Sequence, residues 1–460
     1  MDQPVRSGPG CATAVVMGGG LSGTLAAAAC ARTGMTVTLL ERHGLPAGPL
    51  RRRGVPQAGH PHVLWSGGAE AIEALLPETT SRWLAAGAHR IPLPTGLVCL
   101  TARGWMRRWD EMQYVIACSR DLLDWVIRER VLAMPEVSVR EQTRATGLIG
   151  NATRVRGVTC RTSGGAEQVL EADLVVDAGG RASDIQRWLP RLGIPPVREV
   201  TLPSRVAYAS RVYRAPETSR AGELVSIQCD PGGRPPWTSA GLIPIEHDRW
   251  HVTLTGTPGG YPSRDDNDFE RFARNVRHPL VGDLIARAEP LTRVVRAHST
   301  DNRRRYFEKC RNWPDGLVVL GDAVATYNPI YGQGMTVAAQ SALALHRELD
   351  RGSSRHLSRR VQNAVSRPVA MAWTLATSAD ALYQQQSSPG ATLQSLIVQA
   401  AFNRLTHAAT GRPEAARALL DTMTLSRSPA ALMRLRTLHA FLRGPALHDL
   451  DGPPPRPIAP

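Results

Sequence analysis

The sequence is poor in several features that mark particular classes of protein. Aromatic residues make up 5% of the 460 residues, so the composition gives no sign of a surface on which nucleic-acid bases stack. Lysine occurs once, at Lys309, and the other 54 basic residues are arginines scattered along the chain. We therefore interpret the net charge of +15 as a solvated basic surface and expect no nucleic-acid partner. The same charge would attract an acidic partner or a phosphorylated substrate carrier.

Cysteine pairs and membrane-spanning segments are also missing. The seven cysteines are odd in number and widely spaced, and no C-x-x-C occurs, which is typical of free thiols in a reducing cytoplasm and indicates no metal site. Residues 11–40 are nearly all apolar or small, but no net positive charge precedes them and glycines interrupt them. No other stretch has the length needed to cross a bilayer. We expect an unprocessed, soluble, cytoplasmic protein without integral membrane insertion.

The beginning of the chain carries the pattern of a dinucleotide site. An apolar run at 12–17 predicts a buried parallel strand, and Gly18-Gly-Gly-Leu-Ser-Gly23 follows it at once. A small-residue helix is expected over 25–31 and a second strand over 36–40, closed by Glu41. The pattern is G-x-G-x-x-G between a strand and a helix, with an acid 18 residues after the last glycine. It predicts a Rossmann-like unit.

Each residue of this motif has a physical task. Gly18 permits the tight turn, Gly20 lets the backbone approach a pyrophosphate, and Gly23 lets the helix pack on the strand. The pyrophosphate then binds the free N–H groups at the helix N-terminus. Glu41 accepts hydrogen bonds from an adenosine ribose and would repel a 2′-phosphate, which disfavours NADP as the tightly held nucleotide.

A second motif far downstream indicates which dinucleotide is bound. A buried strand over 317–320 leads into Gly321-Asp322, and Gly332-Gln-Gly334-Met335 opens a helix. Asp322 would lie at the carboxyl edge of the sheet, where it can hold ribityl hydroxyls. The helix N-terminus would face the N1/C2=O edge of a flavin, which gains negative charge on reduction. NAD has no group that needs this second arrangement, so the two motifs together predict FAD.

The combination resembles the FAD-dependent monooxygenases of the para-hydroxybenzoate hydroxylase type. Cys118–Asp124 is similar to that family's R-x-x-L segment, whose arginine contacts FAD, and Asp173–Arg181 is similar to its strand ending in D-x-x-G-R. Arg53–Gln57, with His60 and His62, falls where the family places a loop beside the isoalloxazine and ribityl chain. The motifs and the resemblance together imply the cofactor-binding residues Gly18, Gly20, Leu21, Ser22, Gly23, Glu41, Arg42, Arg53, Gln57, Arg120, Ala145, Asp322, Pro329, Gly332, Gly334 and Met335.

Seven segments narrow the resemblance to the flavin epoxidases of polyether ionophore biosynthesis, such as the lasalocid and monensin polyene epoxidases. They are residues 54–57, 60–62, 64–69, 87–91, 117–120, 122–125 and 328–332. The resemblance implies epoxidation of isolated double bonds in a linear polyene polyketide through a C4a-hydroperoxyflavin. That reaction uses O₂ and NAD(P)H, taken directly or through a separate flavin reductase, and needs no protein nucleophile, acid, base or metal. We therefore assign no catalytic residue. Departures at Thr326-Tyr327 and Gln333 affect the substrate side.

Several alternatives stay open. His60 and His62 would share one face of a strand, and a structural or flavin-contacting role is favoured over a metal site because no further ligands occur at matching spacing. Asn328-Pro329 is either a turn or a segment over the flavin face. The alternative functions are a reductase of isoprenoid double bonds, an aromatic hydroxylase and a flavin-binding scaffold without turnover. Halogenation is disfavoured, because residues 105–109 lack the W-x-W-x-I-P of flavin halogenases and the one lysine lies in a basic run.

The expected fold class is α/β, with a Rossmann-like FAD-binding domain, an inserted mixed-sheet substrate domain and C-terminal helices. Period-two alternation and a hairpin at 242–254 indicate the inserted sheet. Apolar residues at i, i+3 and i+4 predict helices over 369–383 and 393–409, with Pro368 in a first turn. The expected units are the FAD-binding domain at 12–202 and 297–350, the substrate domain at 203–296, a helical region at 351–443 and a disordered tail at 444–460.

Overall fold

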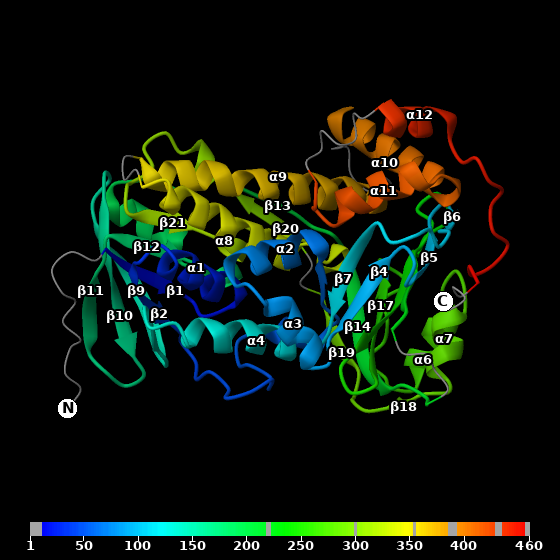
Figure 1. Ribbon diagram of the computed structural model, residues 1–460, viewed down its shortest axis with the longest axis horizontal. Helices are drawn as coiled ribbons and strands as arrows, with labels where there is room; N and C mark the ends of the chain where they lie inside the picture. Colours follow the sequence, from blue (N-terminus) through cyan, green and yellow to red (C-terminus); the bar gives the residue numbers. More distant parts are fainter. Residues whose placement is uncertain are drawn as a thin grey trace.

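A computed structural model describes residues 12–217, 222–298, 301–352, 356–384, 393–427 and 435–455. Two β-rich parts lie side by side in Figure 1, and the long helices α8 (Gly334–Asp350) and α9 (Leu357–Gln384) run above the first part. Helices α10 (Leu393–Gly411), α11 (Pro413–Met423) and α12 (Leu435–Arg443) lie above the second part (Figure 1). This arrangement confirms the predicted α/β fold class with a Rossmann-like unit, a mixed sheet and C-terminal helices.

A parallel sheet forms the centre of the first part. Its strand order is β21 (Leu317–Val319), β12 (Leu174–Asp177), β1 (Thr13–Met17), β2 (Thr36–Leu40) and β8 (Val137–Arg140), and every neighbouring pair is parallel. Helix α1 (Leu21–Ala31) packs against α4 (Arg120–Leu132) and α8. Because β1 and β21 both pair with β12, the strands predicted from the two distant motifs belong to one sheet.

Two small antiparallel sheets and several short helices surround the parallel sheet. The first sheet contains β9 (Thr143–Gly150), β10 (Val155–Thr162) and β11 (Glu167–Glu171), and the second contains β13 (Glu199–Leu202), β20 (Asn302–Arg305) and β22 (Ala325–Thr326). The short helices are η2 (Gly180–Ala182), α5 (Ile185–Trp188), η3 (Leu189–Leu192), η4 (Phe307–Lys309), η5 (Gly321–Ala323) and η6 (Pro329–Tyr331).

The second part is an eight-stranded mixed sheet. Its path is β18 (Glu289–Pro290), β14 (Ala207–Arg214), β17 (Arg249–Gly256), β16 (Thr238–Ile245), β15 (Leu224–Ile227), β5 (Leu97–Thr101) and β6 (Gly104–Trp105), with β19 (Val295–Ala297) on β14. The predicted hairpin is present, and its turn at His247 and Asp248 has positive φ at both residues. Strands β5 and β6 lie outside the substrate domain expected at 203–296 and also belong to this sheet, because β5 pairs in parallel with β15.

The remaining elements join the two parts. A three-stranded sheet of β3 (Val63–Trp65), β7 (Gln113–Ala117) and β4 (His89–Leu93) lies beside helices α2 (Ser66–Leu75) and α3 (Thr79–Ala85). The turn η1 (Pro56–Gly59) precedes β3, and α6 (Asp268–Arg274) and α7 (Leu280–Ile285) cover the end of the large sheet. Pro368 was expected in a first turn but lies inside α9, which packs on α8 and β21 and is held as one helix by those contacts.

Three apolar clusters form the core. The largest joins the parallel sheet to α1, α8 and α9, the second lies between the β3–β7–β4 sheet and α10–α11, and the third lies between the large sheet and α6–α7. In the described part of the chain, no helix combines the length and apolarity needed to span a membrane. Residues 444–455 of the expected tail contain no helix or strand, and 456–460 lie outside the described residues.

Candidate functional site

The glycines of the first motif bring strand, loop and helix into close contact. Gly18 has φ +100°, and a Cβ there would lie 2.6 Å from the carbonyl oxygen of Ala178. A Cβ at Gly23 would lie 1.8 Å from the carbonyl oxygen of Gly18. Gly20 differs, because no heavy atom lies within 4 Å of the Cβ position. Gly18 and Gly23 are therefore needed for packing within the chain, whereas Gly20 faces open space that a ligand can fill.

The acid at the end of β2 lies at this same loop. Glu41 is 4% exposed, and its Oε2 accepts a hydrogen bond from the Gly19 N–H (2.9 Å). Its Oε1 accepts from the His43 N–H (2.9 Å). The Arg52 guanidinium forms an ion pair with Glu41 and donates to the carbonyl oxygen of Gly19 (2.5 Å). Glu41 thus stands beside the N-terminus of α1, where the sequence places an adenosine ribose.

Arg52 is a residue that sequence reasoning missed. Three arginines stand in a row at 51–53, and the pattern alone does not tell which one turns inward. The structure turns Arg52 toward Glu41, while Arg53 and Gln57 are exposed on the same loop. Arg42 is also exposed, and Ala145 is half-buried on β9. The roles of these four predicted residues toward the cofactor stay predictions.

The second motif meets the first one directly. Gly321 has φ +61°, and a Cβ there would lie 2.0 Å from the Ser22 Oγ. Asp322 follows on η5, beyond the end of β21, and is half-buried. Burial raises the pKa of Asp322 above its ordinary value, although the positive charges of Arg120, Arg181 and Arg303 act in the opposite direction. The carboxylate of Asp322, which is predicted to hold ribityl hydroxyls, therefore follows a residue that contacts the first turn of α1.

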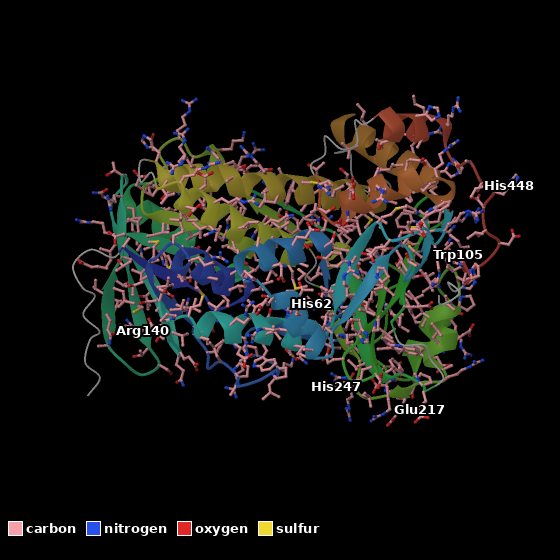
Figure 2. The ribbon with its side chains drawn as sticks, viewed as in Figure 1. His62, Trp105, Arg140, Glu217, His247 and His448 are labelled. Atoms are coloured by element: carbon pink, nitrogen blue, oxygen red, sulfur yellow. The ribbon has the colours of Figure 1, made fainter. Side chains whose placement is uncertain are left out.

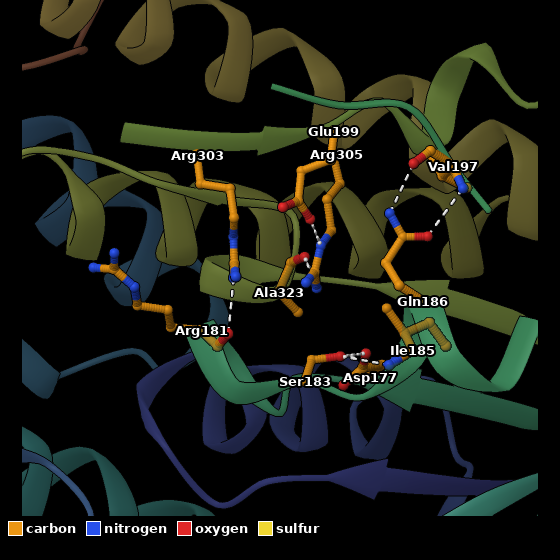
Figure 3. Close-up of polar contacts among 10 residues, drawn as sticks. All are labelled: Asp177, Arg181, Ser183, Ile185, Gln186, Val197, Glu199, Arg303, Arg305 and Ala323. Atoms are coloured by element: carbon orange, nitrogen blue, oxygen red, sulfur yellow. Dashed lines mark hydrogen bonds and ion pairs between the residues drawn. The ribbon is translucent and has the colours of Figure 1, made fainter. Parts of the chain in front are cut away.

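Two arginines of β20 make polar contacts around this turn, as Figure 3 shows. Arg305 donates to the carbonyl oxygen of Ala323 (3.3 Å) and pairs with Glu199 (2.7 Å). Arg303 donates to the carbonyl oxygen of Arg181 (2.8 Å) in the D-x-x-G-R segment. Arg305 thus ties the turn that carries Asp322 to β13, and Arg303 ties β20 to the η2 turn that follows β12.

The N-terminus of α8 completes the second motif. Gly334 begins the helix, and no heavy atom lies within 4 Å of its Cβ position. Met335 follows and is buried. Gly332 has φ +64° and packs against the Trp65 indole, whose Nε1–H donates to the carbonyl oxygen of Tyr331 (3.3 Å). No side chain caps α1 or α8 at its N-cap residue, so their first N–H groups are available to a ligand.

These residues fit FAD. The N-terminus of α1, at Gly20, Leu21 and Ser22, would hold the pyrophosphate, and Glu41 would hold the adenosine ribose. Asp322 would hold the ribityl chain and the N-terminus of α8 the pyrimidine edge of the isoalloxazine. Arg120 begins α4, with its Nε–H donating to Asp124 (2.8 Å), and Pro329 is exposed on η6.

Two buried histidines, His60 and His251, and the half-buried His62 lie between the η1 loop and the large sheet. His60 Nδ1 is 2.8 Å from Ser210 Oγ on β14, His62 Nδ1 is 2.8 Å from the His60 carbonyl oxygen, and His251 Nε2 is 3.2 Å from the Gly59 carbonyl oxygen. Figure 2 places His62 in the middle of the molecule, between the two β-rich parts. Burial lowers the pKa of His60 and of His251 to about 4, and the pKa of His62 is lowered in the same direction. All three are therefore neutral at pH 7.

The described residues contain no group of three or more histidine, cysteine or acidic side chains that could hold a metal ion. A surface hollow of about 700 Å³ opens at the outer edge of the large sheet, between β6 and α10. None of the predicted cofactor residues lines it. The hollow is therefore separate from the place where the two glycine motifs meet.

The parallel sheet with two open glycine-edged helix N-termini at one place defines an FAD-binding oxidoreductase. The family model described as FAD binding domain matches residues 11–354. The chain belongs to this family of FAD-binding proteins.

Comparison with known proteins gives the wider class. The chain is 30% identical over 348 residues to Protein Rv3254 of Mycobacterium tuberculosis, covering 73% of this chain and 72% of that protein. It is 27% identical over 373 residues to 6-methylpretetramide 4-monooxygenase of Streptomyces rimosus, covering 76% and 78%. The structure of the flavin-dependent brominase Bmp2 matches with a TM-score of 0.65 and 14% identity, covering 94% of this chain and 100% of that one, which shows a shared fold. The chain belongs to the FAD-dependent monooxygenase superfamily.

Proposed function

We propose that this protein is an FAD-dependent monooxygenase that epoxidises isolated carbon–carbon double bonds of a linear polyene polyketide in the biosynthesis of a polyether antibiotic. The observation that carries the proposal is the meeting of the two glycine motifs at Ser22 and Gly321, and the buried histidines His60 and His251, whose lowered pKa leaves them without charge at neutral pH, support it. The polyether-epoxidase segments support the substrate class.

Bound FAD would supply the two-electron reduction and the reaction with O₂ that delivers one oxygen atom to the substrate. The overall reaction converts an alkene, O₂, NAD(P)H and a proton to an epoxide, water and NAD(P)⁺. The chain's own residues bind and orient the reactants and exclude water. An alkene carries no proton that must be removed, so this chemistry needs no strong base.

Partly buried apolar side chains of the second core cluster suit such a substrate. Trp65, which contacts Tyr331 and Gly332, is half-buried against this cluster, and so are Met112, Ile243, Phe402 and Met423. The side-chain amide of Gln333 donates to the carbonyl oxygen of Met423 (3.3 Å), which brings the end of α11 to the N-terminus of α8. The C-terminal helices would therefore cover the substrate and keep water from it.

Aromatic hydroxylation is the second candidate, because the similarity to 6-methylpretetramide 4-monooxygenase favours it. Phenol hydroxylation gains from a base that removes the phenolic proton. His60 and His251, each with a pKa of about 4, are weak bases. Halogenation is disfavoured, because the only lysine of the chain, Lys309, is exposed on η4.

The proposal is tested with purified protein, FAD, ¹⁸O₂ and a linear trisubstituted polyene. One arm receives NADPH alone, and the other receives NADPH with a separate flavin reductase, which identifies the route of the electrons. The expected product is an epoxide that carries one labelled oxygen atom. Protein that binds and reduces FAD but forms no labelled epoxide from any polyene would refute the proposal. A labelled phenol from an aromatic substrate would favour the second candidate, and oxygen-independent saturation would indicate a reductase.

A further inference from the structure

One chain segment connects the two predicted flavin contacts of the second motif. It runs from Asn328 to Gly334, between β22 and α8, with Asp322 before it and the open N-terminus of α8 after it. The position of this segment therefore bears on how the first N–H groups of α8 are presented to a ligand that also reaches Asp322. Pro329 and Ile330, at its tip, are exposed.

A buried acid on α9 holds this segment. Asp380 is 1% exposed and lies beyond the end of the family match at residue 354. Its Oδ2 accepts from the Asn302 side-chain amide (2.5 Å), and its Oδ1 accepts from the Asn328 side-chain amide (2.9 Å) and from the Tyr331 hydroxyl (2.6 Å). Two of the three donors belong to the segment itself.

The two asparagines transmit this contact to the backbone. The side-chain oxygen of Asn302 accepts from the Asn328 N–H (2.8 Å), and the side-chain oxygen of Asn328 accepts from the Ile330 N–H (3.3 Å). Each amide is therefore oriented with its oxygen toward the backbone and its NH₂ toward Asp380. Only a group with two acceptor oxygens satisfies all three donors, because an amide at position 380 would turn an NH₂ toward another donor.

Among the described residues, no arginine, lysine or histidine forms an ion pair with this acid. The groups that act on its pKa are the donors of Tyr331, Asn328 and Asn302, which lower it, and the like charge of Asp301, which raises it. Burial is the largest cause and raises the pKa of Asp380 to about 6. The described contacts of Asp380 are thus hydrogen bonds from neutral donors, and such a site is costly unless every donor is in place.

We propose that Asp380 is a positioning residue for FAD, which fixes the segment 328–334 and through it the flavin-facing N-terminus of α8. The C-terminal helices then belong to the cofactor site. A buried negative charge beside this segment also opposes the addition of electrons to a nearby flavin. The proposal rests on FAD binding in the proposed function but not on the substrate.

The test compares Asp380→Asn, which keeps the size of the side chain, with Asp301→Asn. The second variant removes a neighbouring carboxylate that accepts no hydrogen bond from Asn302, Asn328 or Tyr331. Measured quantities are the FAD dissociation constant from flavin fluorescence, the flavin midpoint potential and the visible spectrum. Asp380→Asn is expected to raise the dissociation constant about tenfold or more, because it leaves buried donors unpaired. It is also expected to shift the potential to more positive values and change the spectrum, while Asp301→Asn stays close to the wild type.

Tyr331→Phe provides a second variant if Asp380→Asn does not fold, because it removes one donor and leaves the two asparagines paired. It is expected to change the same quantities in the same direction to a smaller extent. The proposal would be overturned by a folded Asp380→Asn protein whose FAD dissociation constant stays within about twofold of the wild-type value and whose midpoint potential is unchanged within error. Loss of thermal stability without a flavin effect would overturn it equally. A wild-type protein that binds no FAD would defeat the proposed function instead.

Discussion

Replacing Gly20 by alanine should separate cofactor binding from stability. Gly20 has φ −72° and ψ 179°, which alanine adopts without strain, and the new methyl group would contact no protein atom within 4 Å. The unliganded variant should therefore be as stable as the wild type, or more stable by about 0.4–1 kcal/mol through the lower entropy of its unfolded chain. The same methyl group would occupy the space that the pyrophosphate needs.

The expected loss of affinity follows from the contact that is removed. A hydrogen bond from a backbone N–H to a charged phosphate oxygen contributes about 1.5–3 kcal/mol. Its loss raises the FAD dissociation constant roughly ten- to hundredfold, since each 1.4 kcal/mol is about a factor of ten. Titration of the unliganded protein with FAD, followed by flavin fluorescence, measures this constant. Urea unfolding of the same samples measures stability.

Gly23→Ala is the matched control in the same turn. A Cβ at this position would lie 1.8 Å from the carbonyl oxygen of Gly18, and a backbone carbonyl cannot move aside without shifting β1 or α1. We expect a loss of about 3 kcal/mol or more in the free energy of unfolding. The reasoning is refuted if Gly20→Ala binds FAD as tightly as the wild type, or if it unfolds as readily as Gly23→Ala.

Three further predictions concern single contacts. The pKa of His60 is lowered from 6.5 to about 4, first by burial and then by Arg51. The contribution of neutral His60 to the free energy of unfolding is therefore complete above pH 6.5 and is lost as the pH falls toward 4. Between pH 8 and pH 5.5 this loss is about 1.4 kcal/mol for His60 alone, and urea unfolding of His60→Gln should show a shallower pH dependence by that amount; equal slopes would contradict the assignment. In Gly321→Ala, the new Cβ would lie 2.0 Å from Ser22 Oγ at a residue with φ +61°, and the free energy of unfolding should fall by about 1–3 kcal/mol. Adding Ser22→Gly should restore part of this loss, and no restoration would mean that the two motifs do not touch. Lys309→Arg should keep turnover within about twofold of the wild type, because the side chain is exposed; a large loss in product formation would show that this lysine takes part in the reaction.

The parts of the fold that the sequence predicted are those encoded by short-range patterns. The run at 12–17, the three glycines and Glu41 specify a strand, a turn, a helix and a second strand within thirty residues, and the structure has these elements at Thr13–Met17, Leu21–Ala31 and Thr36–Leu40. The hairpin at 242–254 has the same origin, because alternation and a polar turn are local signals. The prediction that both motifs serve one site followed from the rule that ligand sites lie at the carboxyl ends of parallel strands, and the close contact of Gly321 with Ser22 is seen only in the structure.

The parts that the sequence could not predict depend on long-range pairing. The strand Leu97–Thr101 is continuously buried and has no alternation, and it joins the large sheet only through its parallel partner Leu224–Ile227. Arg52 and its two neighbours are chemically identical, so only the folded loop distinguishes them. Asp380 lies on a helix whose pattern predicts only amphipathic packing, and its donors come from two other elements. Such a polar cluster has no signature in a single sequence.

The scarcity of lysine has a practical consequence. Lys309 lies exposed on η4 and is the only residue of the chain with an ε-amine. Apart from the amino terminus, amine-reactive reagents therefore have a single point of attachment, on the surface of the protein. A fluorophore or a solid support coupled to Lys309 would give a uniform conjugate, because every molecule carries it at the same position. No added cysteine or tag is needed for such a conjugate.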